Sequence, residues 1–429
     1  MRIGLFTDSY RPASNGIVYS IDIMRRRLTE LGHDVHVFAP GERHAQDEDD
    51  HLVRVPAITG VGFSESQLSL FFPPRLLRQI EALELDLLTC LTPGQLGLMS
   101  AWAARKTGLP LVAQHTTDVY EYSRSYNALS ASVPLFTVLV SLALKLTPAQ
   151  KRQLLKNYAP GSRAPSSWTR EAVGSFITML YGNCDAVVTL SPKSSRQLAQ
   201  LAEQFQTDLD LRLIPTGVDP LPVVDAATVQ AFRQRLGLAP DDEVALYAGR
   251  LAQEKNLDLL IAMAAPLLRL RPQAKLVLVG DFDHRSALEK AAAQSEAAQA
   301  IVFAGRLPRE ELGQAYQAAD VFVFPSLTDT QGLVLNEAAH AGLPMVLIDT
   351  ELSGCFIPGG NGLAARDEAD DFARQTARLL ADPALRAELG ARSRSLAAGQ
   401  GELAQTKALA DLYAEVAARH QAVSDDPEV

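Results

Sequence analysis

The sequence predicts an α/β protein built from two domains, each containing a parallel β-sheet. The chain has 429 residues, which is more than one ordinary hydrophobic core contains. Short apolar strands alternate with helical patterns in both halves, as expected for βαβ units. A turn-rich stretch, residues 214–220, separates the two halves. These three observations indicate two Rossmann-like domains facing each other across a cleft, onto which both sets of strand carboxyl ends open.

The first half predicts two helices and five strands. The helical periodicity covers residues 17–31 and 95–106. The strands are expected at residues 2–6, 34–38, 86–91, 110–114 and 186–190. We therefore assign residues 1–217 to the first domain.

The second half repeats the alternation, so residues 218–400 are assigned to the second domain. Its strands are expected at residues 244–247, 275–279, 301–303, 321–324 and 345–348. The last helical pattern, 402–419, carries an apolar side that needs a surface to cover. Residues 401–429 are therefore expected to form a tail and a helix that packs on one of the two domains, with a return to the first domain as one alternative.

Composition indicates a globular protein and excludes several classes. Hydrophobic residues make up 47% and charged residues 21%, and the three cysteines show no metal-ligand spacing. Polar Thr7 follows the first strand directly, so no signal peptide is expected and a cytoplasmic location is favoured. The net charge of −10 argues against a nucleic-acid partner. Residues 123–170 are an exception to this negative charge, because they contain seven basic residues and no acidic one. We call this segment the basic island.

The most informative motif is the run SLTDTQGLVLNEAAHAGLP, residues 326–344, which follows a predicted strand. Asp329 lies eight residues before Glu337, so a carboxylate in a loop and a carboxylate on a helix can face one ligand. Residues 331–333, between them, begin the helix, and their backbone amides and the helix dipole attract anions. This pattern suits a nucleotide sugar, whose hydroxyls and phosphates need these groups.

A second motif follows the strand 244–247. Arg250 and Lys255 lie five residues apart across a turn and can hold a diphosphate between them. We expect Lys255 to be a surface charge that matters for turnover and contributes little to stability. No DxD motif lies in a suitable loop, so no metal is expected at this site; the near match at residues 281–283 is interpreted as a turn.

The loop after the first strand, TDSYRPASNG, has the position of a phosphate loop but only one glycine, Gly16. It lacks the GxGxxG fingerprint, which weakens a dehydrogenase interpretation. Gly16 can let a ligand approach the backbone at the helix N-terminus, although a plain turn glycine is the simpler alternative.

Taken together, these motifs resemble the large retaining glycosyltransferase family, the family 4 type with the GT-B fold. That family includes bacterial diacylglycerol glucosyltransferases, phosphatidylinositol mannosyltransferases and sulfoquinovosyltransferases. The resemblance covers nearly the whole chain, in FTDSYRPASNGIVYSI, QHTTDVYEY, IPTGVD, GRLAQEKN, LVGDF, FAGRLPREELGQAYQAADVFVFPS and TDTQGLVLNEAAHAGLP. The TDTQG form looks most like diacylglycerol α-glucosyltransferases.

The resemblance implies a role for each site residue. Arg250 and Lys255 would bind the donor diphosphate, Glu337 the ribose hydroxyls, and Asp329 with the amides of Gln331, Gly332 and Leu333 the donor sugar. Gly16 would assist with its backbone. The family usually has Glu where this chain has Asp329, so sugar preference or rate is expected to differ. No cofactor is implied beyond the donor substrate, a UDP-sugar and first of all UDP-glucose.

The first domain contributes the expected acceptor side. His115 follows the strand 110–114 and matches the family's active-site histidine, with a role in hydrogen bonding to the donor sugar or guiding the acceptor hydroxyl. Tyr120 and Tyr122 are expected to line the same entrance. No side chain stands out as a covalent nucleophile, which favours attack from the face of the leaving group.

An apolar stretch, VPLFTVLVSLALKL at residues 133–146, lies within the basic island. At 14 residues it is too short to span a bilayer. It can lie in an anionic membrane interface with nearby basic residues on the headgroups, or it can be a core helix. The expected acceptor or membrane contacts are Lys145, Lys151, Arg152 and Lys156.

The function expected from the sequence is hexosyl transfer from a nucleotide diphosphate sugar to a lipid such as diacylglycerol, at the inner face of the cell membrane. A soluble or cell-envelope saccharide acceptor is the near alternative. A nucleotide-sugar epimerase and an inactive nucleotide-sugar sensor are more distant alternatives.

Overall fold

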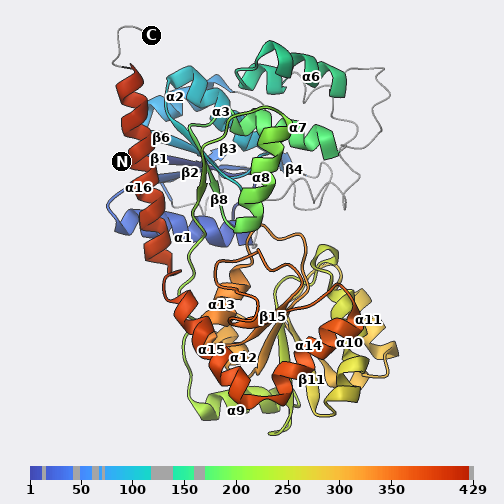
Figure 1. Ribbon diagram of the computed structural model, residues 1–429. Coiled ribbons are helices and arrows are strands. Elements are labelled where there is room, and N and C mark those ends of the chain that lie inside the picture. Colours follow the sequence, from blue (N-terminus) through green and yellow to red (C-terminus); the bar gives the residue numbers. More distant parts are fainter. Residues whose placement is uncertain are drawn as a thin grey trace. The chain divides into compact units, whose positions relative to one another are not determined.

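The computed structural model divides the chain into two compact units, which are described separately (Figure 1). The first comprises Met1–Thr216 and Glu402–Val429, and the second Gly217–Gly401. The structure describes residues 1–11, 16–41, 49–59, 67–69, 73–116, 139–158 and 170–424.

The first unit is built on a parallel sheet, which has seven strands in the described residues, in the order β3-β2-β1-β6-β7-β8-β9. A separate antiparallel pair joins β4 and β5. The strands are β1 (Arg2–Phe6), β2 (Asp34–Pro40), β3 (Leu52–Val55), β4 (Ala57–Thr59), β5 (Gln67–Ser69), β6 (Leu87–Cys90), β7 (Leu111–Gln114), β8 (Ala186–Thr189) and β9 (Leu211–Leu213).

The helices of the first unit include one from the far end of the chain. They are α1 (Gly16–Glu30), α2 (Pro74–Ala82), α3 (Gln95–Thr107), α6 (Pro148–Tyr158), α7 (Arg170–Tyr181), α8 (Pro192–Gln204) and α16 (Glu402–Ser424). Tyr413 and Val416 of α16 are buried in one cluster with Val18 and Ile21 of α1, and Figure 1 shows the two helices side by side. Glu402, itself buried, binds Arg27 of α1 at 3.0 Å.

The second unit is also built on a parallel sheet, in the order β12-β11-β10-β13-β14-β15. Its elements are α9 (Ala226–Arg235), β10 (Glu243–Ala248), η2 (Gln253–Lys255), α10 (Leu257–Leu270), β11 (Ala274–Val279), α11 (Arg285–Gln294), η3 (Ala298–Ala300), β12 (Ile301–Gly305), α12 (Arg309–Gln317), β13 (Val321–Phe324), α13 (Leu333–Ala341), β14 (Met345–Leu347), β15 (Gly362–Ala364), α14 (Ala369–Ala381) and α15 (Pro383–Ala397). The strand order reverses between β10 and β13, the place where open α/β sheets bind ligands.

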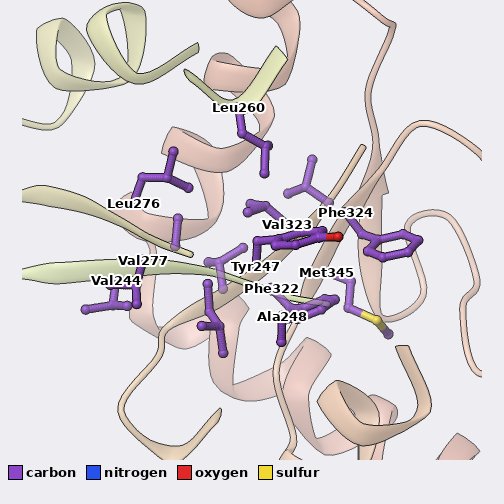
Figure 2. Close-up of a cluster of buried hydrophobic side chains, with 14 of the residues drawn as sticks. Val244, Tyr247, Ala248, Leu260, Leu276, Val277, Phe322, Val323, Phe324 and Met345 are labelled. Carbon is purple, nitrogen blue, oxygen red and sulfur yellow. The ribbon is translucent and has the colours of Figure 1, made fainter. Parts of the chain in front are cut away.

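Aromatic residues fill the core beneath this reversal point. The ring of Tyr247, on β10, stacks on that of Phe324, on β13, with centroids 6.0 Å apart (Figure 2). Tyr247 donates its hydroxyl hydrogen to the carbonyl of Arg250 at 3.0 Å. The core therefore fixes the start of the loop that follows β10.

The structure confirms the two parallel sheets and adds strands that the sequence pattern did not reveal. All ten expected strands are present, with boundaries shifted by a few residues at most. The additional strands are short, and three of them, β3, β9 and β15, lie at sheet edges. These three strands are only partly buried, so they lack the continuous apolar run by which the buried strands were recognised.

In the described part of the basic apolar segment, residues 139–158, most of the apolar side chains are buried, and Lys145, Lys151 and Arg152 are exposed. Val140, Ala143 and Leu144 are buried, whereas the side chain of Leu142 is exposed. Asn183 accepts a hydrogen bond from the backbone amide of Lys145 at 2.7 Å and fixes this turn on α7. Within the described residues, we find no helix with the length and apolar character that a bilayer span requires.

Candidate donor-binding site

Three neighbouring strands of the second unit end in polar groups. Parallel pairing brings the carboxyl ends of β11, β10 and β13 to one edge of the sheet. The loop after β10 carries Arg250 and Lys255, the loop after β11 carries Phe282, and the loop after β13 carries Asp329. The sheet therefore brings together residues that are up to 79 positions apart in the sequence.

The closest polar contact at this edge joins Lys255 and Asp329. The Lys255 Nζ lies 2.5 Å from Asp329 Oδ1, and both side chains are more than four-fifths buried. Burial by itself would raise the pKa of Asp329, but Lys255, helped by Ser326 and Arg250, holds that pKa below its usual value. The carboxylate is therefore ionised at neutral pH. The expectation that Lys255 is a surface charge is wrong, because the β13 loop covers it.

Arg250 is held by two groups that the sequence analysis did not select. Its guanidinium lies 3.0 Å from Glu254 Oε1 and stacks over the ring of Phe282, 4.9 Å from the centroid. The i, i+4 spacing of Arg250 and Glu254 was a usable signal, whereas nothing in the sequence joins Arg250 to Phe282. Arg250 remains one-third exposed, so its charge is available to a ligand.

The loops after β10 and β13 are fastened to each other. Thr328 Oγ1 donates to the backbone carbonyl of Glu254 at 3.0 Å. Asn256 adopts a left-handed conformation, with φ of 58°, and its side chain donates to Asp367 at 2.9 Å. These bonds fix the turn on which Lys255 lies.

The helix α13 begins directly after the β13 loop. Gly332 is its N-cap residue, and a Cβ there would lie 2.8 Å from Leu335 Cδ1, so a larger residue would disturb the first turn. Gln331 is buried and Leu333 is the first helical residue. The first-turn amides of α13 therefore point out of the same edge of the sheet at which Asp329 lies.

Glu337 lies one turn further along α13 and is almost fully buried. Its Oε1 accepts from Arg309 at 3.0 Å and its Oε2 accepts from the Tyr316 hydroxyl at 2.9 Å. Burial raises the pKa of Glu337 above its usual value, against the opposing effects of Arg309 and Tyr316. Both partners lie on α12, and no sequence signal related them to Glu337.

His115 and Gly16 belong to the first unit. His115 is buried at the end of β7, and its Nδ1 lies 3.0 Å from the Tyr181 hydroxyl. Burial lowers the pKa of His115 to about 4, so the imidazole is neutral at pH 7. Gly16 begins α1, and a Cβ there would meet no atom of the described residues within 4 Å. The protein surroundings therefore do not by themselves require glycine at this position.

The first sheet also carries a partly buried carboxylate at its own reversal point, between β1 and β6. Asp8 accepts from Thr92 Oγ1 at 2.5 Å and from the backbone amide of Leu96 at 2.9 Å. Burial raises the pKa of Asp8. Since its oxygens face the first turn of α3, Asp8 satisfies a helix terminus, a role that the sequence analysis did not assign.

The remaining predicted contacts are four basic residues on or near α6 and two tyrosines. Lys145, Lys151 and Arg152 are exposed on the first unit. Tyr120 and Tyr122 lie outside the described residues, and of Lys156 only the helical backbone is described.

Comparison with known proteins gives matches along most of the chain. The family described as glycosyl transferases group 1 matches residues 228–396, and that described as Glycosyltransferase Family 4 matches residues 14–220. Alpha-monoglucosyldiacylglycerol synthase of Streptococcus pneumoniae is 23% identical over 85% of this chain and 77% of its own. The protein of the same name from Acholeplasma laidlawii is 27% identical over 85% and 84%.

Another relative carries a different donor in its name. GDP-mannose-dependent alpha-mannosyltransferase of Mycobacterium tuberculosis is 27% identical over 84% of each chain. Among solved structures, Anabaena HepE in complex with UDP superimposes with a TM-score of 0.69 and 17% identity, covering 97% of this chain and 100% of that one.

Proposed function

Because the chain belongs to the family 4 type of glycosyltransferases with the GT-B fold, we propose that it transfers a hexosyl group from a UDP-sugar, glucose first of all, to a lipid hydroxyl such as that of diacylglycerol. The observation that carries the proposal is the Lys255–Asp329 pair beside Arg250 and the N-terminus of α13. Cations and helix amides suit a diphosphate, and carboxylates suit sugar hydroxyls.

The donor is proposed to bind by replacing contacts within the free protein. The diphosphate takes Lys255 and Arg250, which frees Asp329 to accept hydrogen bonds from the sugar. Each carboxylate oxygen of Glu337 continues to accept one hydrogen bond, from Arg309 or from Tyr316. The remaining lone pairs of the two oxygens accept hydrogen bonds from the ribose hydroxyls. Gly16 is proposed to admit the phosphates to the backbone of α1.

We propose retention of the anomeric configuration and no requirement for a metal at this site. Two cationic side chains and a helix N-terminus can stabilise the leaving diphosphate electrostatically. The departing phosphate oxygen then accepts the proton of the attacking hydroxyl. A neutral His115 can hydrogen-bond the donor sugar or the acceptor hydroxyl without serving as an acid.

The proposal that the acceptor is a lipid is based on the names of two relatives and on exposed residues of the first unit. Two of the relatives are named for the glucosylation of diacylglycerol. Exposed Leu142 and the basic side chains of Lys145, Lys151 and Arg152 lie close together in the sequence of the first unit, and we propose that they contact an anionic membrane surface on the cytoplasmic side. A soluble or cell-envelope acceptor is the second candidate, favoured by the burial of most of the neighbouring apolar residues.

The deciding experiment combines each of several nucleotide sugars with diacylglycerol, phosphatidylinositol, total lipid extract and soluble polyols. Mass spectrometry identifies the products, and the anomeric proton coupling in NMR gives the stereochemistry. Glucosylated diacylglycerol with the α configuration and full activity in a chelator supports the proposal. Transfer only to soluble acceptors, an inverted product, epimerised nucleotide sugar or tight binding without turnover overturns it.

Vesicle pelleting tests the membrane contact separately. We expect binding to vesicles that contain anionic lipid and loss of this binding as salt is raised. The variant Lys151→Glu with Arg152→Glu should pellet several-fold less, whereas Lys275→Glu, which changes a partly exposed lysine of the second unit, should behave as the unmodified protein. Equal pelleting of neutral and anionic vesicles would contradict a headgroup contact.

A further inference from the structure

Two histidines and an aspartate converge at the edge of the first sheet. Asp34 and His36 are two residues apart on β2 and therefore project from the same face of the strand. His51 precedes β3, which pairs in parallel with β2 so that Val37 lies opposite Leu52. Since the backbone amide of Val37 donates to the carbonyl of His51 at 2.8 Å, this register puts His51 beside His36. The topology, and no sequence motif, creates the cluster.

The three side chains present their donor atoms to one point. Asp34 Oδ1 lies 3.2 Å from His36 Nε2 and 3.1 Å from His51 Nε2. One ligand atom from each of the three residues lies within 4.8 Å of the others. Ligands about 2.0–2.1 Å from a tetrahedral zinc ion are about 3.3–3.4 Å apart. The separations from Asp34 to the two imidazoles therefore already match a zinc site. The separation between the two imidazoles closes by a small rotation of the exposed His51 ring.

The surroundings orient these ligands as outer groups do at metal sites. Asp49 Oδ1 accepts a hydrogen bond from the backbone amide of His51 at 3.0 Å and lies 3.9 Å from His51 Nδ1, so this carboxylate is on the Nδ1 side of the ring and Nε2 faces Asp34. Asp49 is itself fixed by Arg25, whose Nη2 donates to it at 2.7 Å. His36 is nine-tenths buried, and its ring lies 4.8 Å from that of His51. Both imidazoles therefore lose little freedom on binding an ion.

A positive charge faces the second carboxylate oxygen of Asp34. The Arg2 guanidinium lies 3.8 Å from Asp34 Oδ2, on the side away from the imidazole contacts, and it also binds Glu84 at 2.5 Å. Asp34 thus keeps Oδ1 for the imidazoles. Two neutral imidazoles and one carboxylate suit zinc or a similar divalent transition-metal ion better than calcium or magnesium, which prefer oxygen ligands.

We propose that Asp34, His36 and His51 bind a zinc ion that fastens the edge strand β3 to β2. The site is structural, because Asp34 begins β2 and six further residues, about 20 Å of strand, separate it from the carboxyl edge of the sheet. The ion completes its coordination with water. It stabilises the first unit and takes no part in sugar transfer.

The test uses the full-length chain without an affinity tag, stripped with a chelator and titrated with zinc in a calorimeter. We expect one ion per chain, and His51→Gln and Asp34→Asn should each weaken binding at least 100-fold. His51 is half exposed, so its replacement leaves the fold intact. The matched control is His284→Gln, which removes another histidine–aspartate pair, 2.9 Å from Asp258 in the second unit, and should leave zinc affinity unchanged.

Cobalt absorption and thermal unfolding give independent readouts. Cobalt should give the intense visible bands of a tetrahedral site in the unmodified chain and not in His51→Gln. Zinc should raise the unfolding temperature of the unmodified chain and leave that of His51→Gln unchanged. Equal zinc affinity of the unmodified chain and His51→Gln overturns the proposal. A thiolate-to-cobalt band also overturns it, because it would assign the ion to a cysteine. Binding only at millimolar zinc would identify the cluster as a hydrogen-bonded histidine–aspartate array.

Discussion

The ammonium group of Lys255 lies 2.5 Å from the carboxylate of Asp329, and this pair joins the loop after β10 to the loop after β13. Both side chains are largely buried, so each charge depends on the other while the donor is absent. In the proposed reaction the donor separates them, because its phosphates attract the cation and its hydroxyls attract the anion. The same contact therefore serves stability in the free protein and recognition in the complex.

Lys255→Ala is expected to lower turnover by two orders of magnitude or more, since the leaving diphosphate loses a cation. It should also destabilise the second unit by about 3 kcal/mol, because Asp329 remains buried without its partner. Steady-state kinetics and thermal unfolding measure the two effects. The control Lys275→Ala removes a partly exposed lysine of the same sheet and should change neither. Full activity of Lys255→Ala would refute the phosphate assignment.

Asp329→Glu is expected to keep donor KM and turnover within about tenfold of the unmodified enzyme, or to improve them. The carboxylate is retained and advances by one methylene, at a packing cost of about 1–3 kcal/mol in this buried loop. Asp329→Asn is the matched control, because it keeps the size and removes the charge, and it should lose most activity. Complete loss in the Glu variant would show that the pocket is built around the shorter side chain.

Glu337→Gln should weaken nucleotide binding and leave the free protein equally or more stable at neutral pH. Burial raises the pKa of Glu337 in the folded protein. As the pH rises above the ordinary pKa of glutamate, the charged form of Glu337 therefore lowers the free energy of unfolding. Glutamine keeps an acceptor for Tyr316 and removes that cost. Calorimetric titration with UDP and thermal unfolding at pH 7 give the two quantities. A large loss of stability would mean that the Arg309 contact outweighs the burial cost.

His115 should make the first unit sensitive to mild acid. Its pKa is about 4 in the folded protein and about 6.5 in an unfolded chain, so below pH 6.5 the unfolded state binds the additional proton. The contribution of His115 to stability is complete above pH 6.5 and falls by on the order of 3 kcal/mol by pH 4.

Denaturant unfolding at pH 7 and pH 5 measures this effect, and His115→Asn should reduce the difference between the two. In NMR, the His115 ring resonance should stay constant from pH 7.5 to 5.5. Titration of His115 near pH 6.5 would contradict a buried neutral imidazole.

Local patterns carried much of this information. The alternation of short apolar strands with helical patterns predicted the parallel sheets. Arg250, Lys255, Asp329 and Glu337 were recognisable because their spacing is set by one turn or one helix. The edge strand β3 was missed because it is only partly buried and Arg54 interrupts its apolar residues. Glu254, the i, i+4 partner of Arg250, could have been found.

The sequence alone determined the fold class, the order of the elements and the residues that carry charge at strand ends, since these depend on neighbours along the chain. Only the tertiary structure decided that Lys255 is buried against Asp329, that Arg309 and Tyr316 hold Glu337, and that α16 packs on α1. It also decided the meeting of Asp34, His36 and His51. These contacts join segments tens to hundreds of residues apart, and they depend on strand order and register, which local propensity does not encode.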